Sequence, residues 1–281
     1  MQDIDISSHP SVELSVLMCV YNGDVFLVQA IESILAQTFT EFEFIIVDDA
    51  STDKTPQILA EYAQKDSRIK ILKNSENLGL TKSLNIGLHA AQGKYIARMD
   101  ADDIALPDRF MTQYWFMEEH PSLAAIGSFV QVIDKKGQVL GEKKLAVSYE
   151  DIKSKMLFNN QFIHSTLFFR ADRLKESGGY DESFRKSQDY ELMFRLSSKY
   201  PVANLTQNLL QFRFHTESIS WTNTEQQKNG IRARWNAIRI YQYPFLKGMY
   251  HIIIRLFWLA VPKKLKVLYA QKKMQHFIKP I

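Results

Sequence analysis

The sequence predicts an α/β fold in which a mostly parallel sheet is covered by helices. Short apolar stretches alternate with amphipathic stretches through the first hundred residues, as expected of successive strand–helix units. Each predicted strand runs directly into polar or acidic residues. The 281-residue chain is also long enough to bury a substantial core.

The predicted elements follow one another closely. Strands are expected at Leu14–Val20, Phe42–Val47, Ile69–Leu72 and 95–99. Helices are expected between them: one with apolar residues at helical spacing from Leu27 to Leu35, one whose first turn contains Pro56, and one over Leu80–Gln92 that Gly93 ends.

Polar clusters at 21–24, 48–53, 74–79 and 100–103 follow the four strands. Ligands of open α/β sheets bind in the crevice outside the carboxyl ends of the strands. We therefore expect these clusters to line one pocket.

The second half of the chain has a more mixed pattern. Helices are expected at Pro107–His120 and Gln188–Tyr200, strands at Leu123–Ile133 and Phe162–Arg170, and a loop at Gly178–Asp181. Since no linker separates the halves, residues 1–222 are predicted to form one catalytic domain, followed by a C-terminal helical extension over 223–281.

Three carboxylates gather within four residues at Asp100, Asp102 and Asp103. An isolated Asp-x-Asp is most often a solvated turn, but this one ends a predicted buried strand. Hard divalent cations prefer oxygen ligands, and Mg²⁺ or Mn²⁺ held by one or two carboxylates keeps open positions for substrate phosphates. The cluster therefore predicts a site for a metal and a phosphorylated substrate.

Other cofactor and redox chemistries lack support in the sequence. No Gly-x-Gly-x-x-Gly follows a predicted strand, and no Gly-Lys-Ser/Thr loop is present, which argues against dinucleotide-binding dehydrogenases and P-loop enzymes. The single cysteine, Cys19, cannot form an intrachain disulfide and is expected to be a core residue in a reducing compartment.

Charge is distributed unevenly around the net value of +4. All 31 acidic residues stand at or before Glu225, whereas 12 of the 35 basic residues follow it; the first 225 residues thus carry 23 basic residues and a net charge of −8. Basic residues mixed with aromatics over 244–268 suit a helix lying on an anionic membrane surface, and packing on the domain is the alternative. Nucleic acid is not expected as a partner, because no binding motif accompanies the charge.

Seven motifs in order between Leu14 and Ser220 together resemble an inverting family 2 glycosyltransferase with the GT-A fold, of the bacterial surface-polysaccharide type. They are Val20-Tyr21-Asn22-Gly23, Ile46-Val47-Asp48-Asp49-Ala50-Ser51-Thr52-Asp53, Asn77-Leu78-Gly79 with Asn85, Met99-Asp100-Ala101-Asp102-Asp103, Gly178-Gly179-Tyr180-Asp181, Gln188-Asp189-Tyr190-Glu191 and Phe212-Arg213-Phe214-His215.

The resemblance implies a nucleotide-diphosphate sugar donor, with UDP favoured, and Mn²⁺ or Mg²⁺ as cofactor. The residues implied to bind the donor are Tyr21, Asp49, Lys82 and Asp100, and those implied to bind the metal are Asp102 and His215. Several alternatives remain open: Asp48 or Asp49 caps the helix that begins near Thr55, Asp103 is purely structural, Lys82 is a solvated surface lysine, and His164 and His215 are structural.

The resemblance also implies that Asp189 is the general base that deprotonates an acceptor hydroxyl. The family's preceding Glu is replaced by Gln188 here. On the predicted helix Asp189 shares the apolar stripe, where partial burial would raise its pKa, while Glu191 points away from it. The residues implied to lie on the acceptor side are His164, Gly179 and Tyr180.

The expected reaction builds a polysaccharide or lipid-linked glycan. With no basic region followed by an apolar run at its start, the chain is expected to be cytoplasmic, on the inner face of the cytoplasmic membrane. The competing functions are a sugar-phosphate nucleotidyltransferase, which usually has a Gly-rich basic loop after its first strand, and a non-catalytic nucleotide- or glycan-binding module.

Overall fold

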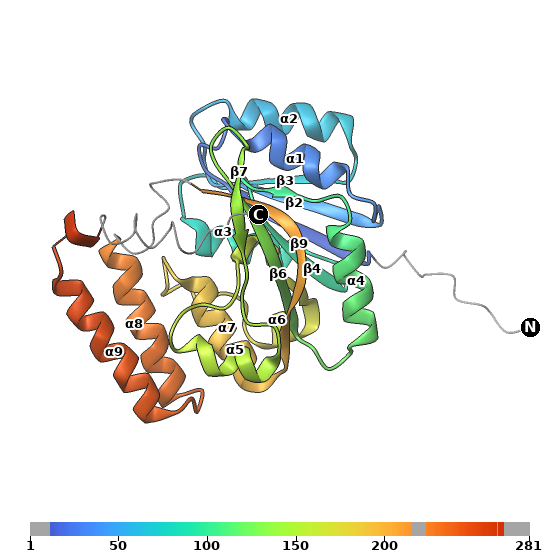
Figure 1. Ribbon diagram of the computed structural model, residues 1–281. Coiled ribbons are helices and arrows are strands. Elements are labelled where there is room, and N and C mark those ends of the chain that lie inside the picture. The colour runs from blue at the N-terminus through green and yellow to red at the C-terminus, as the bar shows by residue number, and fades with distance from the viewer. Residues whose placement is uncertain (1–11, 215–222, 263, 267–281) are drawn as a thin grey trace, which may run out of the picture.

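The computed structural model describes residues 12–214, 223–262 and 264–266. One sheet runs through the molecule in the order β3-β2-β1-β4-β8-β6-β9-β5, and β7 pairs with β6 (Figure 1). The strands are β1 (Leu14–Val20), β2 (Phe42–Asp48), β3 (Ile69–Lys73), β4 (Tyr95–Asp100), β5 (Ile104–Ala105), β6 (Ala125–Ile133), β7 (Val139–Lys143), β8 (Phe168–Arg170) and β9 (Val202–Arg213).

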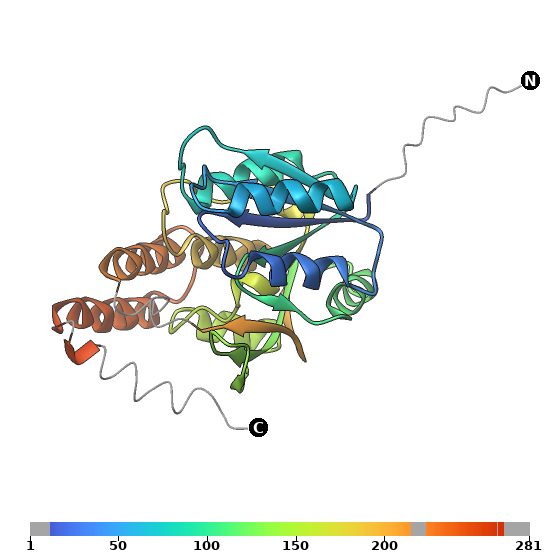
Figure 2. The ribbon, with the colours of Figure 1, turned by 90° about the horizontal axis from the view of Figure 1, so that it is seen from above.

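Helices cover both faces of this sheet (Figures 1 and 2). They are α1 (Leu27–Leu35), α2 (Thr55–Lys65), α3 (Leu80–Ala90), α4 (Arg109–Glu119), α5 (Tyr149–Met156), the 3₁₀ turn η1 (His164–Thr166), α6 (Ala171–Glu176), α7 (Gln188–Lys199), α8 (Thr224–Arg239) and α9 (Phe245–Ala260). One apolar core lies between the sheet and α1, α2 and α4, and a second lies between the sheet and α3, α5, α7 and α8.

The alternating side chains of β1 explain why two cores form. Val16 and Met18 join the core beneath α1, while Leu17 and Cys19 join the core beneath α3, as expected for a pleated strand buried on both faces. Strands β1, β2, β3 and β4 are mutually parallel, so their carboxyl ends share one edge of the sheet. The strand–helix order predicted for this half is confirmed.

The second half of the sheet is mixed. Strand β8 runs antiparallel to both β4 and β6, whereas β6 and β9 are parallel. The strand predicted over Phe162–Arg170 is wrong for most of its length: His164–Thr166 forms the 3₁₀ turn, and only Phe168–Arg170 is a strand. The Thr166 hydroxyl donates to the Ile163 carbonyl at 2.8 Å, which stabilises the turn.

Strand β9 was not predicted from the sequence. Its alternation is interrupted by a polar stretch at 206–208, where its register with β6 also shifts. Gly93 was expected to end α3, but the helix ends at Ala90. A Cβ at Gly93 would clash with the backbone of Ser15, so this glycine allows two chain segments to approach closely.

Helices α8 and α9 lie side by side at one edge of the molecule (Figures 1 and 2). Ala233 and Ala237 of α8 and Ile252 of α9 belong to the same core as α7. A Cβ at Gly248 would clash with Ile238, which is how α9 lies so close to α8. The division of the chain at residue 222 stays a prediction.

Candidate active site

The loops after β1 and β2 are bonded together at the carboxyl edge of the sheet. Backbone amides of Asn22 and Gly23 donate to the hydroxyls of Ser51 and Thr55, both at 3.0 Å. In return, the Asn22 side-chain oxygen accepts from the Thr52 amide at 2.8 Å. The polar clusters predicted at 21–24 and 48–53 therefore meet as expected.

Asp49 holds the loop that follows β3. It is 4% exposed, its Oδ1 accepts from the Asn74 side chain at 2.7 Å and from the Leu78 amide at 2.9 Å, and its Oδ2 accepts from the Gly79 amide at 2.8 Å. A carboxylate offers about four acceptor positions, so one position on Oδ2 is left for a further donor. Tyr21 and Lys82, at the mouth of these loops, are exposed.

Neither Asp48 nor Asp49 caps α2, so that alternative is wrong. The Asp48 carboxylate accepts from the Ser51 amide at 3.0 Å. The first amide of α2, that of Thr55, donates instead to Asp53 at 2.9 Å. Asp53 was not assigned this role from the sequence, although its position before Pro56 is a helix-start signal.

Asp100, Asp102 and Asp103 form the acidic cluster at the end of β4, with one oxygen of each within 4.8 Å of the others. The carboxylate of Asp100 forms an ion pair with Arg98 and accepts from the Ser165 hydroxyl at 2.6 Å. Burial opposes ionisation of Asp100, but the Arg98 charge outweighs it and lowers the pKa to about 2. The buried Arg98 guanidinium therefore keeps the Asp100 carboxyl in its anionic form.

Asp103 is more deeply buried than its neighbours, and its Oδ1 accepts from the Arg213 amide at 2.8 Å. Its Oδ2 has no hydrogen-bond partner among the residues that the structure describes. Burial, reinforced by the charges of Asp102 and Asp100, raises the pKa of Asp103 well above its usual range.

The guanidinium of Arg213 fixes the acidic turn from behind. It donates to the Asp102 carbonyl at 2.8 Å and to Gln29 at 2.8 Å, and stacks 4.3 Å from the Phe26 ring. Three clustered carboxylates, one with an unpartnered buried oxygen, fit a hard divalent cation. His215, the other predicted metal ligand, lies outside the described residues.

Asp189 lies in the first turn of α7, where its Oδ2 accepts from the Asn160 side chain at 2.8 Å. Burial raises the pKa of Asp189, as the sequence predicted. The expectation that Glu191 points away from the buried side is wrong, because α8 covers the second side of α7. Glu191 is 1% exposed and pairs with Arg195 at 2.8 Å and with the Tyr241 hydroxyl at 2.7 Å.

His164 and Tyr180 meet beside the acidic cluster, with Nε2 of the histidine 2.8 Å from the tyrosine hydroxyl. Burial, followed by the Arg98 charge, lowers the pKa of His164 well below its usual range, so the imidazole is neutral. Gly179 has a φ of +66°, and a Cβ there would lie 2.9 Å from the Asn85 side chain.

Four contributors to the site were not assigned from the sequence: Arg98, Asn160, Ser165 and Lys143. Burial lowers the pKa of Lys143 to about 8, while the Asp189 charge opposes that effect. Arg98 had a visible signal, a charged residue inside an apolar strand pattern. The other three belong to segments that only the folded chain brings to the site.

An acidic cluster thus lies at the carboxyl edge of a helix-covered α/β sheet. A profile of the family described as "Glycosyl transferase family 2" matches residues 15–176, more than half of the chain. The chain belongs to this family. It is 31% identical over 257 residues to the amylovoran biosynthesis glycosyltransferase AmsE of Erwinia amylovora, covering 89% of this chain and 95% of the relative.

Two solved structures share the fold. S. aureus TarS 1-349 in complex with UDP-GlcNAc superposes with a TM-score of 0.67 at 20% identity, covering 87% of this chain and 72% of TarS. The mannosyltransferase PcManGT from Pyrobaculum calidifontis, in complex with GDP-Man and Mn²⁺, gives a TM-score of 0.64 at 16% identity, covering 96% of this chain and 77% of that one.

Proposed function

We propose that the protein transfers a sugar, with inversion, from a UDP-linked donor to a glycan or lipid-linked glycan hydroxyl in polysaccharide biosynthesis. The observation that carries this is the convergence of the Asp49 loops and the Asp100–Asp103 cluster at one edge of the sheet. AmsE, named for amylovoran biosynthesis, supports the polysaccharide assignment, and the ligands of TarS and PcManGT support a nucleotide-sugar donor.

The donor's base is assigned to Tyr21 and Asp49. Tyr21 is 50% exposed, which leaves its ring available for packing against a base. The remaining acceptor position on Asp49 Oδ2 suits a ring N–H of uracil. Lys82, exposed one turn into α3, is assigned to the diphosphate, and Asp100 to the ribose or to the water around the metal.

Mn²⁺ or Mg²⁺ would be held by Asp102 together with His215, and when bound it neutralises the charge on the departing diphosphate. The protein's own contribution is to fix the turn. Arg213 bonds to the Asp102 carbonyl, and Arg98 holds the neighbouring Asp100 carboxylate.

In the proposed reaction, the Asp189 carboxylate accepts the proton of the acceptor hydroxyl as that oxygen bonds to the anomeric carbon. The bond between the anomeric carbon and the diphosphate oxygen breaks on the opposite face, so the nucleoside diphosphate leaves and the configuration inverts. His164, Gly179 and Tyr180 are assigned to the acceptor side. The neutral imidazole of His164 is suited to hydrogen bonding with a sugar hydroxyl.

The decisive experiment incubates the protein with Mn²⁺ and single nucleotide sugars, first without an acceptor. Thermal stabilisation by one donor, with slow release of UDP, is the expected result. Production of pyrophosphate would identify a nucleotidyltransferase instead, and binding with no product from any donor or acceptor would identify a binding module.

A pH prediction follows from Asn160. Its side-chain amide donates to Asp189, and such a bond favours the ionised carboxylate. Asn160→Ala should therefore raise the pKa of Asp189 further. Since the base works only when ionised, transfer is lost as the pH falls through this pKa, and the acid limb of the pH–rate profile should move to higher pH.

The matched control is Asn159→Ala, the same change one residue earlier, where the side chain is not bonded to Asp189. Its acid limb should coincide with that of the unmodified protein. Coincident acid limbs for Asn160→Ala and the unmodified protein would contradict the assignment of Asp189 as the base.

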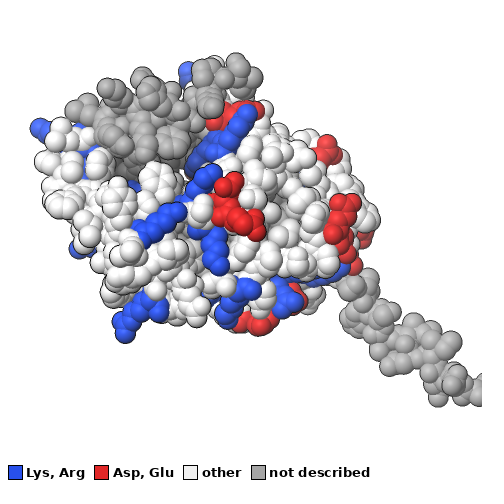
Figure 3. Space-filling view, turned by 60° about the horizontal axis from the view of Figure 1, so that its bottom comes forward, with Lys and Arg blue, Asp and Glu red and all other residues white. Residues whose placement is uncertain are grey.

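We further propose that α9 attaches the enzyme to the inner face of the cytoplasmic membrane. Among the described residues, no helix has the length and apolarity needed to cross a bilayer. The exposed side of α9 is apolar instead, with Leu246, Tyr250, Ile253 and Phe257 at helical spacing along it. On the face that Figure 3 shows, the described surface at the left, where these helices lie, has basic and uncharged residues but no acidic ones. That combination suits insertion among anionic headgroups.

The test replaces Leu246 and Phe257, which are 83% and 73% exposed, together by glutamate. Each buried side chain of this size contributes about 1.5–3 kcal/mol, so co-sedimentation with anionic liposomes at low salt should fall by more than about tenfold. Trp115→Glu, the same kind of change on α4 at 57% exposure, should sediment normally. Equal sedimentation of all three proteins would exclude α9 as the attachment surface.

A further inference from the structure

The loop over residues 177–184 carries Tyr180 and is held in an unusual backbone conformation. Gly178 and Gly179 have φ angles of +88° and +66°, in the left-handed region that glycine adopts without strain. The Tyr180 ring is buried, and its hydroxyl meets His164 at 2.8 Å. The position of this loop therefore determines the position of the Tyr180 side chain.

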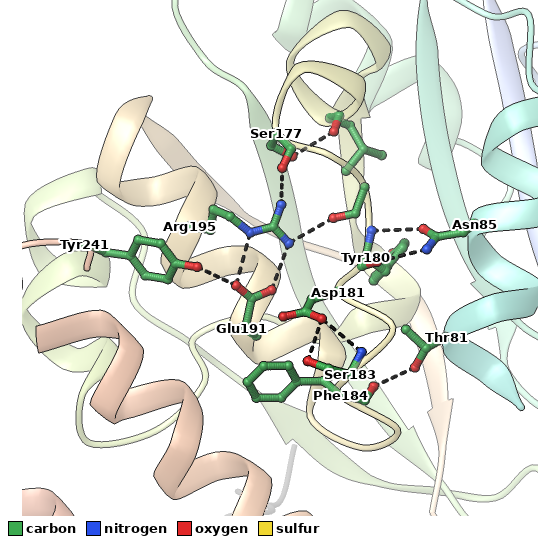
Figure 4. Close-up of polar contacts among 12 residues, drawn as sticks. Thr81, Asn85, Ser177, Tyr180, Asp181, Ser183, Phe184, Glu191, Arg195 and Tyr241 are labelled. Carbon is green, nitrogen blue, oxygen red and sulfur yellow. Dashed lines mark hydrogen bonds and ion pairs between the residues drawn. The ribbon is translucent and has the colours of Figure 1, made fainter. Parts of the chain in front are cut away.

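Helix α3 anchors one side of this loop (Figure 4). The Asn85 side chain accepts from the Tyr180 amide at 2.9 Å and donates to the Tyr180 carbonyl at 2.8 Å. The Thr81 hydroxyl donates to the Phe184 carbonyl at 2.7 Å. These bonds fix one side of the loop and satisfy both the N–H and the carbonyl oxygen of the Tyr180 backbone.

Arg195 of α7 anchors the opposite side. Its guanidinium donates to the carbonyl of Ser177 and, at 2.9 Å, to the carbonyl of Gly179. The same group is paired in fork geometry with Glu191 at 3.0 and 2.8 Å. Glu191 in turn accepts a hydrogen bond from the Tyr241 hydroxyl at 2.7 Å (Figure 4). Tyr241 belongs to the segment that connects α8 to α9.

A second residue of the C-terminal helices reaches the same loop. Arg232 of α8 donates to the Ser183 carbonyl at 3.1 Å and to the Ser183 hydroxyl at 2.8 Å, and its guanidinium lies 4.3 Å from the centre of the Phe184 ring. Two residues beyond residue 222, Arg232 and Tyr241, thus contribute to holding this loop.

We propose that Tyr241, acting through Glu191 and Arg195, is a positioning element for the acceptor side of the active site. This inference rests on the proposed function, which assigns Gly179 and Tyr180 to the acceptor. Arg195 makes four hydrogen bonds here, two to backbone carbonyls and two to the Glu191 carboxylate, whereas a lysine ammonium has only three donors. The Tyr241 hydroxyl orients the Glu191 carboxylate, and this carboxylate orients the Arg195 guanidinium. The C-terminal extension therefore helps to build the acceptor site, in addition to its proposed contact with a membrane.

The first test needs no substrate. Tyr241→Phe removes one hydroxyl, and Tyr250→Phe makes the same change at an exposed position of α9. A hydrogen bond to a buried charged group is worth enough that amide hydrogen exchange over 177–184 should become about tenfold faster in Tyr241→Phe. Exchange in β1 should stay unchanged, as should that of the whole Tyr250→Phe protein.

Arg195→Lys provides a second variant that keeps the charge but removes the fork. It should accelerate exchange over 177–184 at least as much as Tyr241→Phe. If both variants leave exchange in this segment unchanged, the network does not position the loop and the inference is overturned.

The kinetic test separates positioning from folding. With UDP-GlcNAc, Mn²⁺ and p-nitrophenyl pyranosides as acceptors, Tyr241→Phe should lower kcat/KM for the acceptor about tenfold, while UDP release without acceptor stays within about twofold. A merely structural role would lower both rates together, and that result would overturn the inference. If the unmodified protein transfers no sugar from any nucleotide-sugar donor to any acceptor, the proposed function fails, and the exchange data still decide whether the network holds the loop.

Discussion

Asp102→Asn is expected to abolish most transfer and most metal-dependent binding of UDP. The substitution keeps the size of the side chain but removes the charge assigned to the metal. Loss of one preorganised electrostatic group at a reacting centre typically costs on the order of 10²–10³ in turnover. Titration calorimetry of UDP binding, with and without Mn²⁺, measures the binding part separately from the rate.

Asp172→Asn is the matched control, because that carboxylate is 72% exposed at the start of α6, away from the cluster. It should bind UDP with the same Mn²⁺ dependence as the unmodified protein. If Asp102→Asn shares that unchanged dependence, Asp102 is not the metal ligand, and the acidic cluster must be explained as a structural turn fixed by Arg98 and Arg213.

Asp189→Asn is expected to reduce turnover by on the order of 10²–10⁴, the usual contribution of a positioned general base. Donor affinity should stay near normal, because the residues assigned to the donor lie on other loops. Single-turnover rates with saturating donor, together with calorimetric donor affinities, test the two halves of this expectation.

Glu191→Gln is the informative comparison two residues further along α7. It weakens a buried ion pair with Arg195, so thermal stability should fall, by as much as about 3 kcal/mol. Asp189→Asn should leave stability nearly unchanged. A loss of donor affinity in Asp189→Asn as large as its loss of turnover would identify Asp189 as a structural residue.

The local sequence was sufficient for the first half of the fold. A continuous apolar run such as Leu14–Val20 indicates a strand that is buried on both faces, as in a parallel sheet. Because parallel strands share one carboxyl edge, the polar residues that follow them must lie together at that edge. The acidic cluster and the Asp49 loop could be located by that rule alone. The raised pKa of Asp189 also followed from its place on an apolar stripe.

Tertiary structure decided which of these polar groups have partners. The pattern around Glu191 indicated an outward-facing side chain, yet α8, more than thirty residues later, buries it against Tyr241. His164 was expected in a strand, but it lies in a 3₁₀ turn that brings it to Tyr180. The sequence by itself determined where polar groups occur along the chain, because strand and helix periodicity is a local property. Their charge states and partners depend on burial and on contacts between distant segments, which only the folded chain establishes.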